Sequence, residues 1–201
     1  FDVQTETPLM QDAIRPEKQL MPRAVQAMGY ETAVIGKWHL VAEPVGFDYY
    51  NVLGGQGRYM NPLLKEKDVE AWRLDKLGGI EREGHVTDVI TNEALDWLEN
   101  RPAGDEKPFF LMLHYKAPHD MYQNAPRYNE YLEDVDIPEP ESLWERGNHG
   151  PIGRPQYSSS IGRRSPRKLG RDLGIDANLS DDEFKHEAYQ YYLKRYLRCV
   201  K

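Results

Sequence analysis

Two pairs of cationic or protonatable side chains stand out in this chain of 201 residues. Lys37 and His39 form the first pair, and Lys116 and His119 form the second. A lysine supplies a compact positive charge that suits an anion, and a histidine can give a proton to a leaving oxygen near neutral pH. Side chains of these types, brought together, predict a site for a tetrahedral oxyanion whose ester bond is broken.

Each pair follows a short apolar run that is typical of a buried strand. Residues 31–36 and 108–115 are largely apolar and contain β-branched or aromatic side chains. In an open parallel sheet, ligands bind outside the carboxyl ends of the strands. Strands of one sheet would therefore bring both pairs to the same edge. Either pair alone is typical of an ordinary surface loop, so the prediction depends on their convergence.

Helical patterns precede both strands. Pro22 suits the first turn of a helix, and Gly29 fits the position just past its end. Thr87 and Asp88 are suited to cap a second helix before the second strand. The segment 43–64 is rich in glycine and aromatic residues, and we expect it to be irregular loop.

The alternation of helix and strand predicts an α/β fold with a mostly parallel central sheet flanked by helices. Residues 1–120 form the core part of a single domain in this interpretation. Prolines interrupt residues 121–181, which are predicted to be a variable, loop-rich insertion. Ser180 and Glu183 then have the spacing of a capping box, and residues 182–201 are predicted to begin a core helix.

Composition excludes several classes of function. A net charge of −7 gives no electrostatic basis for binding nucleic acid. The single cysteine, Cys199, excludes an intrachain disulfide and a multi-cysteine zinc site. No run in the sequence reaches the roughly 20 apolar residues that span a bilayer. The chain begins at Phe1 rather than Met and stops at Lys201 within a helical pattern, so we expect both ends to be cuts in a longer protein.

The segment around the first pair resembles a known signature. Residues 29–40 read Gly-Tyr-Glu-Thr-Ala-Val-Ile-Gly-Lys-Trp-His-Leu, and these twelve consecutive positions are similar to the second signature segment of type I sulfatases. These sulfatases belong to the alkaline phosphatase superfamily. Further segments resemble the family in the same order along the chain: 46–50, 57–62, 84–88, 108–111 and 117–119. The resemblance extends over residues 16–128 and, more weakly, over 192–201.

The resemblance implies an alkaline-phosphatase-like fold, of which this chain is a part, and roles for three residues. Lys37 would contact both the nucleophile and the sulfate group of the substrate. His39 would hydrogen-bond the hydroxyl of the nucleophile, and His119 would protonate the leaving alcohol. The implied activity is sulfuric ester hydrolysis, on a sulfated carbohydrate or a smaller sulfate ester. Family habit places such bacterial enzymes in the periplasm or outside the cell.

The resemblance also implies two groups that this chain does not supply. The nucleophile of the family is a formylglycine hydrate made from a Cys or Ser in a Cys/Ser-x-Pro-x-Arg motif, and a Ca²⁺ ion polarises the sulfate. The motif is absent from this sequence: Ser165-Pro-Arg167 lacks the spacing, and Cys199 is followed by Val200 and Lys201. We therefore expect formylglycine and the Ca²⁺ ligands to lie outside this chain, and the isolated fragment to be inactive.

Several residues near the two pairs have two interpretations. His114 is interpreted as a packed strand residue rather than a catalytic one. Lys116 is left open between a substrate contact and a residue that varies without consequence. Arg58 and Tyr59 could contact the organic part of a substrate, although a loop packed by its own aromatic side chains is favoured. Asp120 has no assigned role.

A basic run and the single cysteine complete the candidates. The basic run could attract a polyanion such as a sulfated glycan, although a solvated loop face is favoured. Cys199 is interpreted as a small packed residue. The members of the basic run are Arg154, Arg163, Arg164, Arg167, Lys168 and Arg171.

Two rival functions remain beside sulfatase activity. A phosphodiesterase or phosphonate monoester hydrolase of the same superfamily would use the same oxyanion-binding arrangement. A non-catalytic relative could bind sulfated glycans through the basic run. In each case the predicted partner is a small anionic ester or a sulfated glycan, and not a nucleic acid.

Overall fold

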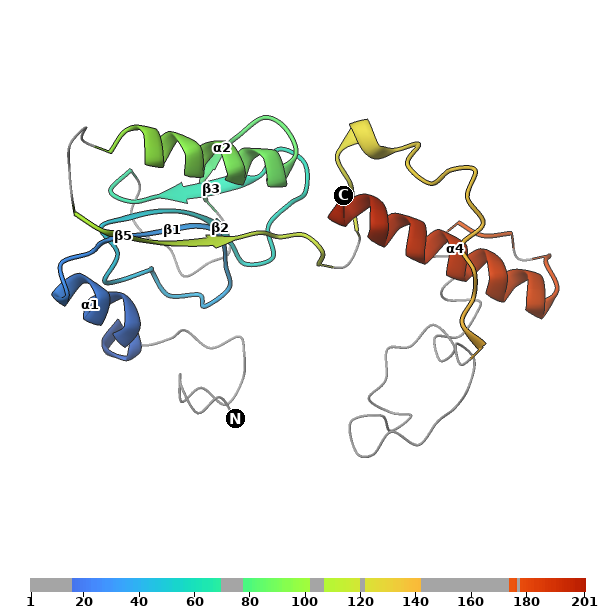
Figure 1. The fold of residues 1–201 in the computed structure, drawn as a ribbon, viewed down its shortest axis with the longest axis horizontal. Coiled ribbons are helices and arrows are strands. Elements are labelled where there is room, and N and C mark those ends of the chain that lie inside the picture. Colours follow the sequence, from blue (N-terminus) through green and yellow to red (C-terminus); the bar gives the residue numbers. More distant parts are fainter. Residues whose placement is uncertain (1–15, 70–77, 102–106, 120–121, 142–173, 177) are drawn as a thin grey trace. The chain divides into compact units, whose positions relative to one another are not determined.

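A computed structural model of the chain describes residues 16–69, 78–101, 107–119, 122–141, 174–176 and 178–201. The chain divides into two compact units, Phe1–His119 and Asp120–Lys201, and each is described by itself. The first unit combines a sheet with helices, and the second is built around a long helix (Figure 1).

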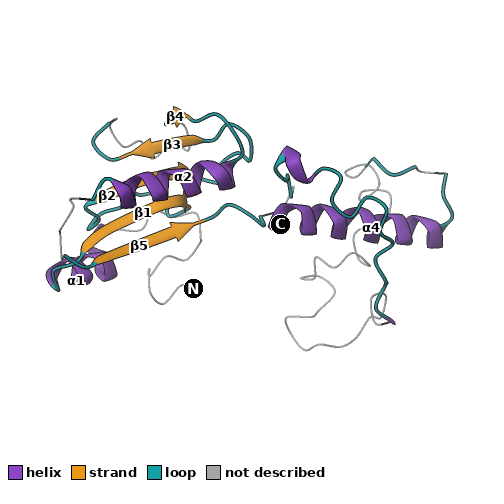
Figure 2. Cartoon of the chain, turned by 45° about the horizontal axis from the view of Figure 1, so that its top comes forward, coloured by secondary structure: helices purple, strands orange, loops and turns teal. Residues whose placement is uncertain are grey.

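The first unit contains a five-stranded sheet in the order β4-β3-β2-β1-β5 (Figure 2). β1 pairs in parallel with both β2 and β5, whereas β3 is antiparallel to β2 and to β4. The predicted α/β class is therefore confirmed, with a mixed sheet whose parallel part is centred on β1. The strands are β1, Glu31–Trp38; β2, Tyr49–Gly54; β3, Leu63–Glu66; β4, Ile80–Glu81; and β5, Phe109–His114.

Both predicted strands are present, as β1 and β5, and they are direct neighbours. The residues from Thr32 to Ile35 are fully buried in β1, as a continuous run of β-branched and small apolar side chains predicts. Gly36 lies opposite His114 in the register of the two strands. A Cβ on Gly36 would overlap the carbonyl oxygen of His114, so only glycine permits this approach.

Helices α1 and α2 lie on opposite faces of the sheet (Figure 1). A short 3-10 turn, Pro16–Lys18, precedes α1, which spans Leu20–Ala27. Pro22 in its first turn is buried, and Gly29 lies just past its end with a φ of 91°, as predicted.

Helix α2 spans Val86–Glu99 and begins one residue before the predicted capping pair. Its N-cap is His85, whose ring Nδ1 accepts a hydrogen bond from the N–H of Thr87 at 3.4 Å. Asp88 lies in the first turn, where a negative charge favours the helix. The helix ends with Asn100 as its C-cap. Its buried face consists of Val86, Val89, Ile90 and Ala94.

The segment 43–64, expected to be irregular loop, instead contains β2 and the start of β3. Asn51 interrupts the apolar pattern of β2 in the sequence, yet it is fully buried. Its side-chain amide donates a hydrogen bond to Glu93 of α2 at 2.7 Å. Arg82 binds the other carboxylate oxygen of Glu93 at 3.0 Å and also reaches Glu66 at 3.3 Å. A polar network that no local pattern shows therefore lets a buried asparagine occupy a central strand.

The second unit is organised by helix α4, Asp181–Val200. The predicted capping box is confirmed, because Ser180 Oγ accepts from the N–H of Glu183 and the Glu183 carboxylate accepts from the N–H of Ser180. On the same helix, the amide of Gln190 binds both backbone polar groups of Ile137, at 3.0 and 2.7 Å. The extended segment before residue 142 is thereby fixed along the helix.

Aromatic packing holds the other end of α4. The ring of Tyr122 meets those of Tyr192 and Tyr196 edge to face, with centroids 5.3 and 5.7 Å apart. Cys199 is buried at 8% exposure, which agrees with its interpretation as a packed residue. Within the described residues, no helix has both the length and the apolar character needed to cross a membrane.

Replacing Gly36 by alanine should destabilise the full-length protein by about 3 kcal/mol or more, because steric overlap adds to the strain of a positive φ. Gly29→Ala is the matched control, since its φ is also positive but no atom lies within 4 Å of the added Cβ. We expect it to cost about 1–2 kcal/mol. Denaturant unfolding measures both, and equal losses would contradict the close approach of β1 and β5.

The carboxylate of Asp48 should make stability depend on acid pH. Burial alone raises the pKa of Asp48, but hydrogen bonds from Thr32 and Gln26 outweigh it and lower the pKa below its ordinary value of 3.8. The stabilisation is therefore present above that pH and lost as pH falls through the lowered pKa. Asp48→Asn should reduce the loss of stability between neutral pH and pH 3, measured by thermal unfolding. Asp96→Asn, at an exposed carboxylate of α2, is the control, and an identical acid dependence in wild type and Asp48→Asn would refute the prediction.

Candidate active site

Three strand ends meet at one edge of the sheet. β1 ends at Trp38 and β5 ends at His114, and the two strands are parallel neighbours. β2 is parallel to β1 on its other side, with Gly54 opposite Trp38. The segments that leave these strands therefore begin side by side. This is the arrangement that the sequence predicted for its two cationic pairs.

The amino group of Lys37 contacts the loop that follows β2. Its Nζ donates a hydrogen bond to Oε1 of Gln56 at 2.5 Å, and the side chain is half-buried. On the β5 side, Nδ1 of His114 lies 3.3 Å from the carbonyl oxygen of Lys37. His114 is thus a half-buried strand residue that contacts the backbone of β1, as predicted.

Lys116 joins the turn after β5 to the same loop. Its side chain is almost completely buried, with 6% exposure. The ammonium donates to the carbonyl oxygen of Gln56 at 3.0 Å and lies 4.6 Å from the centre of the Tyr59 ring, over its face. A buried ammonium needs such partners because water no longer solvates it. Lys116 therefore places a buried positive charge against the loop that follows β2.

His119 has both backbone polar groups hydrogen-bonded. Its N–H donates to the carbonyl oxygen of Lys116 at 2.9 Å, which closes a turn that contains the cis peptide bond before Pro118. Its own carbonyl oxygen accepts from the hydroxyl of Tyr59 at 2.6 Å. The backbone at His119 is therefore fixed from two sides, and its imidazole is half-buried.

Trp38 anchors the chain between Lys37 and His39. Its Nε1 donates to the carbonyl oxygen of Ala42 at 2.7 Å, and its ring meets that of Phe47 at a right angle, with centroids 6.2 Å apart. Neighbouring side chains of a strand point to opposite faces, so a core Trp38 directs Lys37 away from that core cluster. His39 follows directly and is half-buried.

Four cationic or protonatable residues therefore lie at the carboxyl ends of β1 and β5 or shortly after them: Lys37, His39, Lys116 and His119. We call this end of the sheet the cationic edge. Gln56 is a neutral acceptor, so its hydrogen bond leaves the positive charge of Lys37 in place. Positive charges gathered in this way can bind a tetrahedral anion. A half-buried histidine can donate a proton to the oxygen of the leaving group when the ester bond breaks.

Sequence reasoning missed Gln56, which contacts both lysines. Its neighbours Gly55 and Gly57 have φ angles of 58° and 67°, and two glycines around a polar residue were the one signal of a tight turn. For Arg58 and Tyr59, the favoured interpretation was a loop packed by its own aromatic side chains, and it holds for only one of the two residues. Tyr59 is buried at 4% exposure, whereas Arg58 is exposed and pairs with Glu81 at 2.8 Å.

A shallow cavity of about 210 Å³ adjoins this loop. Gly54, the last residue of β2, lines it together with Gln56, whose side chain accepts the hydrogen bond from Lys37. Its position beside the cationic edge makes it a candidate space for part of a substrate. The lining residues are Gly54, Gln56, Gly57, Arg58, Leu63 and Gly78.

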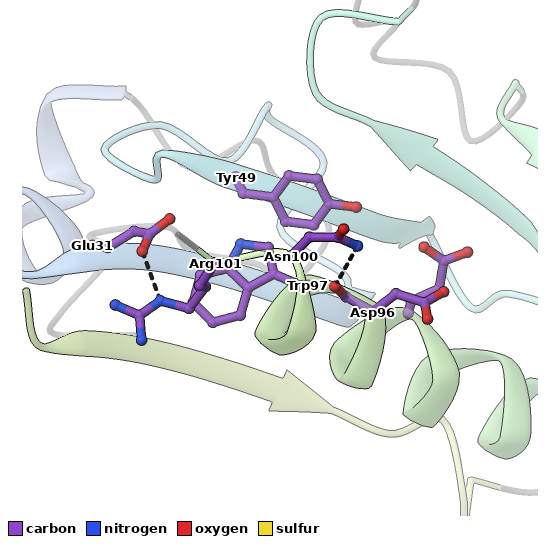
Figure 3. Close-up of a pocket in the computed structure, with 7 residues that line it drawn as sticks. Glu31, Tyr49, Asp96, Trp97, Asn100 and Arg101 are labelled. Carbon is purple, nitrogen blue, oxygen red and sulfur yellow. Dashed lines mark hydrogen bonds and ion pairs between the residues drawn. The ribbon is translucent and has the colours of Figure 1, made fainter. Parts of the chain in front are cut away.

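A second cavity, of about 230 Å³, lies at the opposite edge of the sheet (Figure 3). Glu31 and Tyr49 line it, and they are the first residues of β1 and β2. The ion pair of Arg101 with Glu31 at 2.8 Å occupies one side. Burial, together with the charges of Glu66 and Glu93, raises the pKa of Tyr49 to about 12. This negative environment does not suit a sulfate group.

The part of the chain that the structure describes contains no group of three or more His, Cys, Asp or Glu side chains that could hold a metal ion. The Ca²⁺ that the sequence resemblance implies therefore has no fitting donor set there, and no chemical step is assigned to it. Asp120 and the basic run from Arg154 to Arg171 lie outside the described residues.

Comparison with known proteins agrees with the motifs and the geometry. The family model described as Sulfatase matches residues 1–201. The chain belongs to the sulfatase family. The predicted sulfatase family is thus confirmed, and the match extends beyond the segments 16–128 and 192–201 in which the resemblance was seen.

Relatives of this sulfatase chain include enzymes named for sulfated amino sugars. It is 40% identical over 132 residues to an N-acetylglucosamine-6-O-sulfatase of Bacteroides thetaiotaomicron. The matched region covers 64% of this chain and 22% of that protein. It is 28% identical over 138 residues to the N-acetylglucosamine-6-sulfatase of Homo sapiens, which covers 61% of this chain and 23% of that protein. The sulfatase chain thus spans less than a quarter of the length of these two relatives.

A solved structure extends the likeness to the fold. The structure is that of another protein in complex with its own substrate, D-glucosamine-2-N,6-O-disulfate. The TM-score is 0.72 at 26% sequence identity, and the match covers 100% of this sulfatase chain and 47% of that chain.

Removing the buried ammonium should destabilise this sulfatase. Lys116→Met leaves the carbonyl oxygen of Gln56 without this donor, and we expect a loss of about 1–3 kcal/mol in the free energy of unfolding. The matched control is Lys67→Met, because Lys67 also donates to backbone carbonyl oxygens, those of Phe47 and Asp48, from a more exposed position. Its expected loss is about 0.5 kcal/mol. Comparable losses in the two variants would show that Lys116 is not a buried structural cation.

Proposed function

We propose that the protein containing this chain hydrolyses the 6-O-sulfate ester of a glucosamine unit. The observation that supports the proposal is that β1 and β5 are adjacent and parallel, so that Lys37 and His39 at the carboxyl end of β1 and His119 after β5 follow neighbouring strand ends. The names of two relatives and the substrate of the neighbouring structure supply the sugar and the position of its ester. The reaction breaks the S–O bond to the sugar and consumes one water to give an alcohol and sulfate.

Lys37 holds the sulfate group in this mechanism. Its ammonium is a point charge on a half-buried side chain near the end of a buried strand, where the dielectric is lower than in water and attraction to a sulfate oxygen is stronger. Gln56 keeps the ammonium in place through the hydrogen bond at 2.5 Å. Because this acceptor is neutral, the bond restricts the side chain without cancelling its charge.

His119 gives its proton to the sugar oxygen as the S–O bond breaks. A sugar hydroxyl is a weak acid, so its oxygen leaves poorly without a proton, and a positioned histidine supplies one. The imidazole then regains a proton from solvent, which takes up the proton lost by the attacking nucleophile. His39, next to the anchored Trp38, orients the attacking nucleophile by hydrogen bonding.

The nucleophile lies outside this chain in the proposal. The family resemblance assigns it to a formylglycine residue and assigns polarisation of the sulfate to Ca²⁺, and this chain contains neither the required motif nor, among its described residues, a fitting set of metal ligands. The contribution of this chain is therefore to bind the sulfate and to move the proton.

The function is tested on the full-length protein with N-acetylglucosamine-6-sulfate as substrate. We expect release of inorganic sulfate, measured by ion chromatography, together with N-acetylglucosamine. Release from no sulfate ester, combined with cleavage of an aryl phosphodiester, would favour the phosphodiesterase alternative. Binding of sulfated glycans without any cleavage would favour the non-catalytic alternative.

The roles are tested by substitution in the same protein. Lys37→Met and His119→Ala should each lower kcat/KM for sulfate release by about 10²–10⁴-fold, since each removes charge stabilisation or proton transfer in the transition state. Lys67→Met makes the same chemical change outside the cationic edge and should leave kcat/KM within about twofold. A Lys37→Met variant as active as Lys67→Met would contradict the assignment.

A further inference from the structure

We propose that Tyr59 is a positioning residue for His119, so that proton transfer to the leaving oxygen depends on the hydroxyl of Tyr59. The inference rests on the proposed function. The observation that carries it is the hydrogen bond from the Tyr59 hydroxyl to the carbonyl oxygen of His119 at 2.6 Å, across 60 positions of sequence.

This bond completes the fixation of the His119 backbone. The N–H of His119 is already held by the carbonyl oxygen of Lys116 at 2.9 Å. With the carbonyl oxygen held as well, the peptide groups on both sides of the Cα are restrained, and they set the direction of the Cα–Cβ bond that carries the imidazole and limit its rotamers. Removing the hydroxyl frees one of these peptide groups while it leaves the imidazole chemically intact.

Tyr59 is itself immobilised, which a positioning role requires. It is buried at 4% exposure, and its ring stacks on that of His85 with centroids 5.8 Å apart. The ammonium of Lys116 lies over the ring at 4.6 Å. The backbone carbonyl oxygen of Tyr59 accepts a hydrogen bond from the N–H of Val86, in the first turn of α2, at 2.7 Å. The hydroxyl is therefore presented to His119 from a rigid base.

The hydrogen bond from Tyr59 ties His119, the proposed proton donor, to the loop after β2 and not only to its own turn. The turn that carries His119 leaves β5, whereas Tyr59 lies on the loop after β2 and is bound to α2. A shift of about 1 Å at a reacting group can lower a rate by about 10²-fold. The expected effect of losing one of these backbone hydrogen bonds is smaller, about tenfold in kcat.

A double-mutant cycle tests the proposal in the full-length protein, with N-acetylglucosamine-6-sulfate as substrate. Tyr59→Phe should lower kcat by about tenfold with KM changed by less than about twofold. In a His119→Ala background the same substitution should have no further effect, because the alanine keeps the carbonyl oxygen but has no imidazole to position. Equal losses in both backgrounds would show a general structural effect and overturn the proposal.

Tyr50→Phe is the matched control. Tyr50 is buried at 2% exposure, and its hydroxyl donates to Oε1 of Glu43 at 2.6 Å, so the two substitutions remove similar hydrogen bonds. We expect kcat to stay within about twofold of the wild type. A Tyr50→Phe variant that lost as much as Tyr59→Phe would contradict the proposal. A wild-type protein that released no sulfate would refute the proposed function as well, whereas additive losses refute only the role of Tyr59.

Discussion

The contact between the backbones of β1 and β5 at Gly36 is the constraint on which the rest of the first unit depends. A parallel pair brings carboxyl ends to one edge, but the two strands must also approach in the right register. Here Gly36 faces His114, and no side chain larger than hydrogen fits between them. One residue later the chain presents Lys37, and the turn after His114 presents His119. A close backbone contact thus lies next to both segments that carry the candidate site residues.

Hydrogen bonds from side chains to backbone carbonyl oxygens stabilise that edge. Lys116 donates to the carbonyl of Gln56, and Tyr59 donates to that of His119. Each bond joins the turn after β5 to the loop after β2, with β1 between the two strands. Buried carbonyl oxygens are costly when unpaired, so such bonds resist local opening. The edge therefore consists of irregular segments that are nevertheless held firmly.

Sequence reasoning predicted the parts of this structure that local patterns determine. Continuous apolar runs predicted β1 and β5, of which β1 is buried as expected whereas β5 is only half-buried, and the spacing of Ser180 and Glu183 predicted the start of α4. It failed at β2 because the glycine and aromatic residues of 43–64 were interpreted as loop, whereas the strand is stabilised in part by a bond from the buried Asn51 to Glu93, 42 positions away. Nothing in a local pattern announces such a partner.

The site was predicted to the same extent. Strand ends and the family resemblance singled out Lys37, His39 and His119, and the parallel pairing of β1 and β5 places these residues at neighbouring strand ends, while their catalytic roles stay a prediction. Gln56 was missed and Tyr59 was assigned no partner, because their contacts span 19 and 60 positions of sequence. Contacts of this kind depend on the loop geometry after β2, which the glycines around Gln56 permit but do not specify.

The leaving-group dependence of kcat/KM is the measurement that tests the central claim most directly. A series of sulfate esters whose alcohols range from nitrophenol to a simple sugar would be compared for the full-length wild type and His119→Ala. If His119 protonates the leaving oxygen, the wild type shows a shallow dependence on the acidity of the alcohol, and the variant shows a steep one. Parallel dependences in the two proteins would mean that His119 transfers no proton to the leaving oxygen, and the account of this edge as a catalytic site would be wrong.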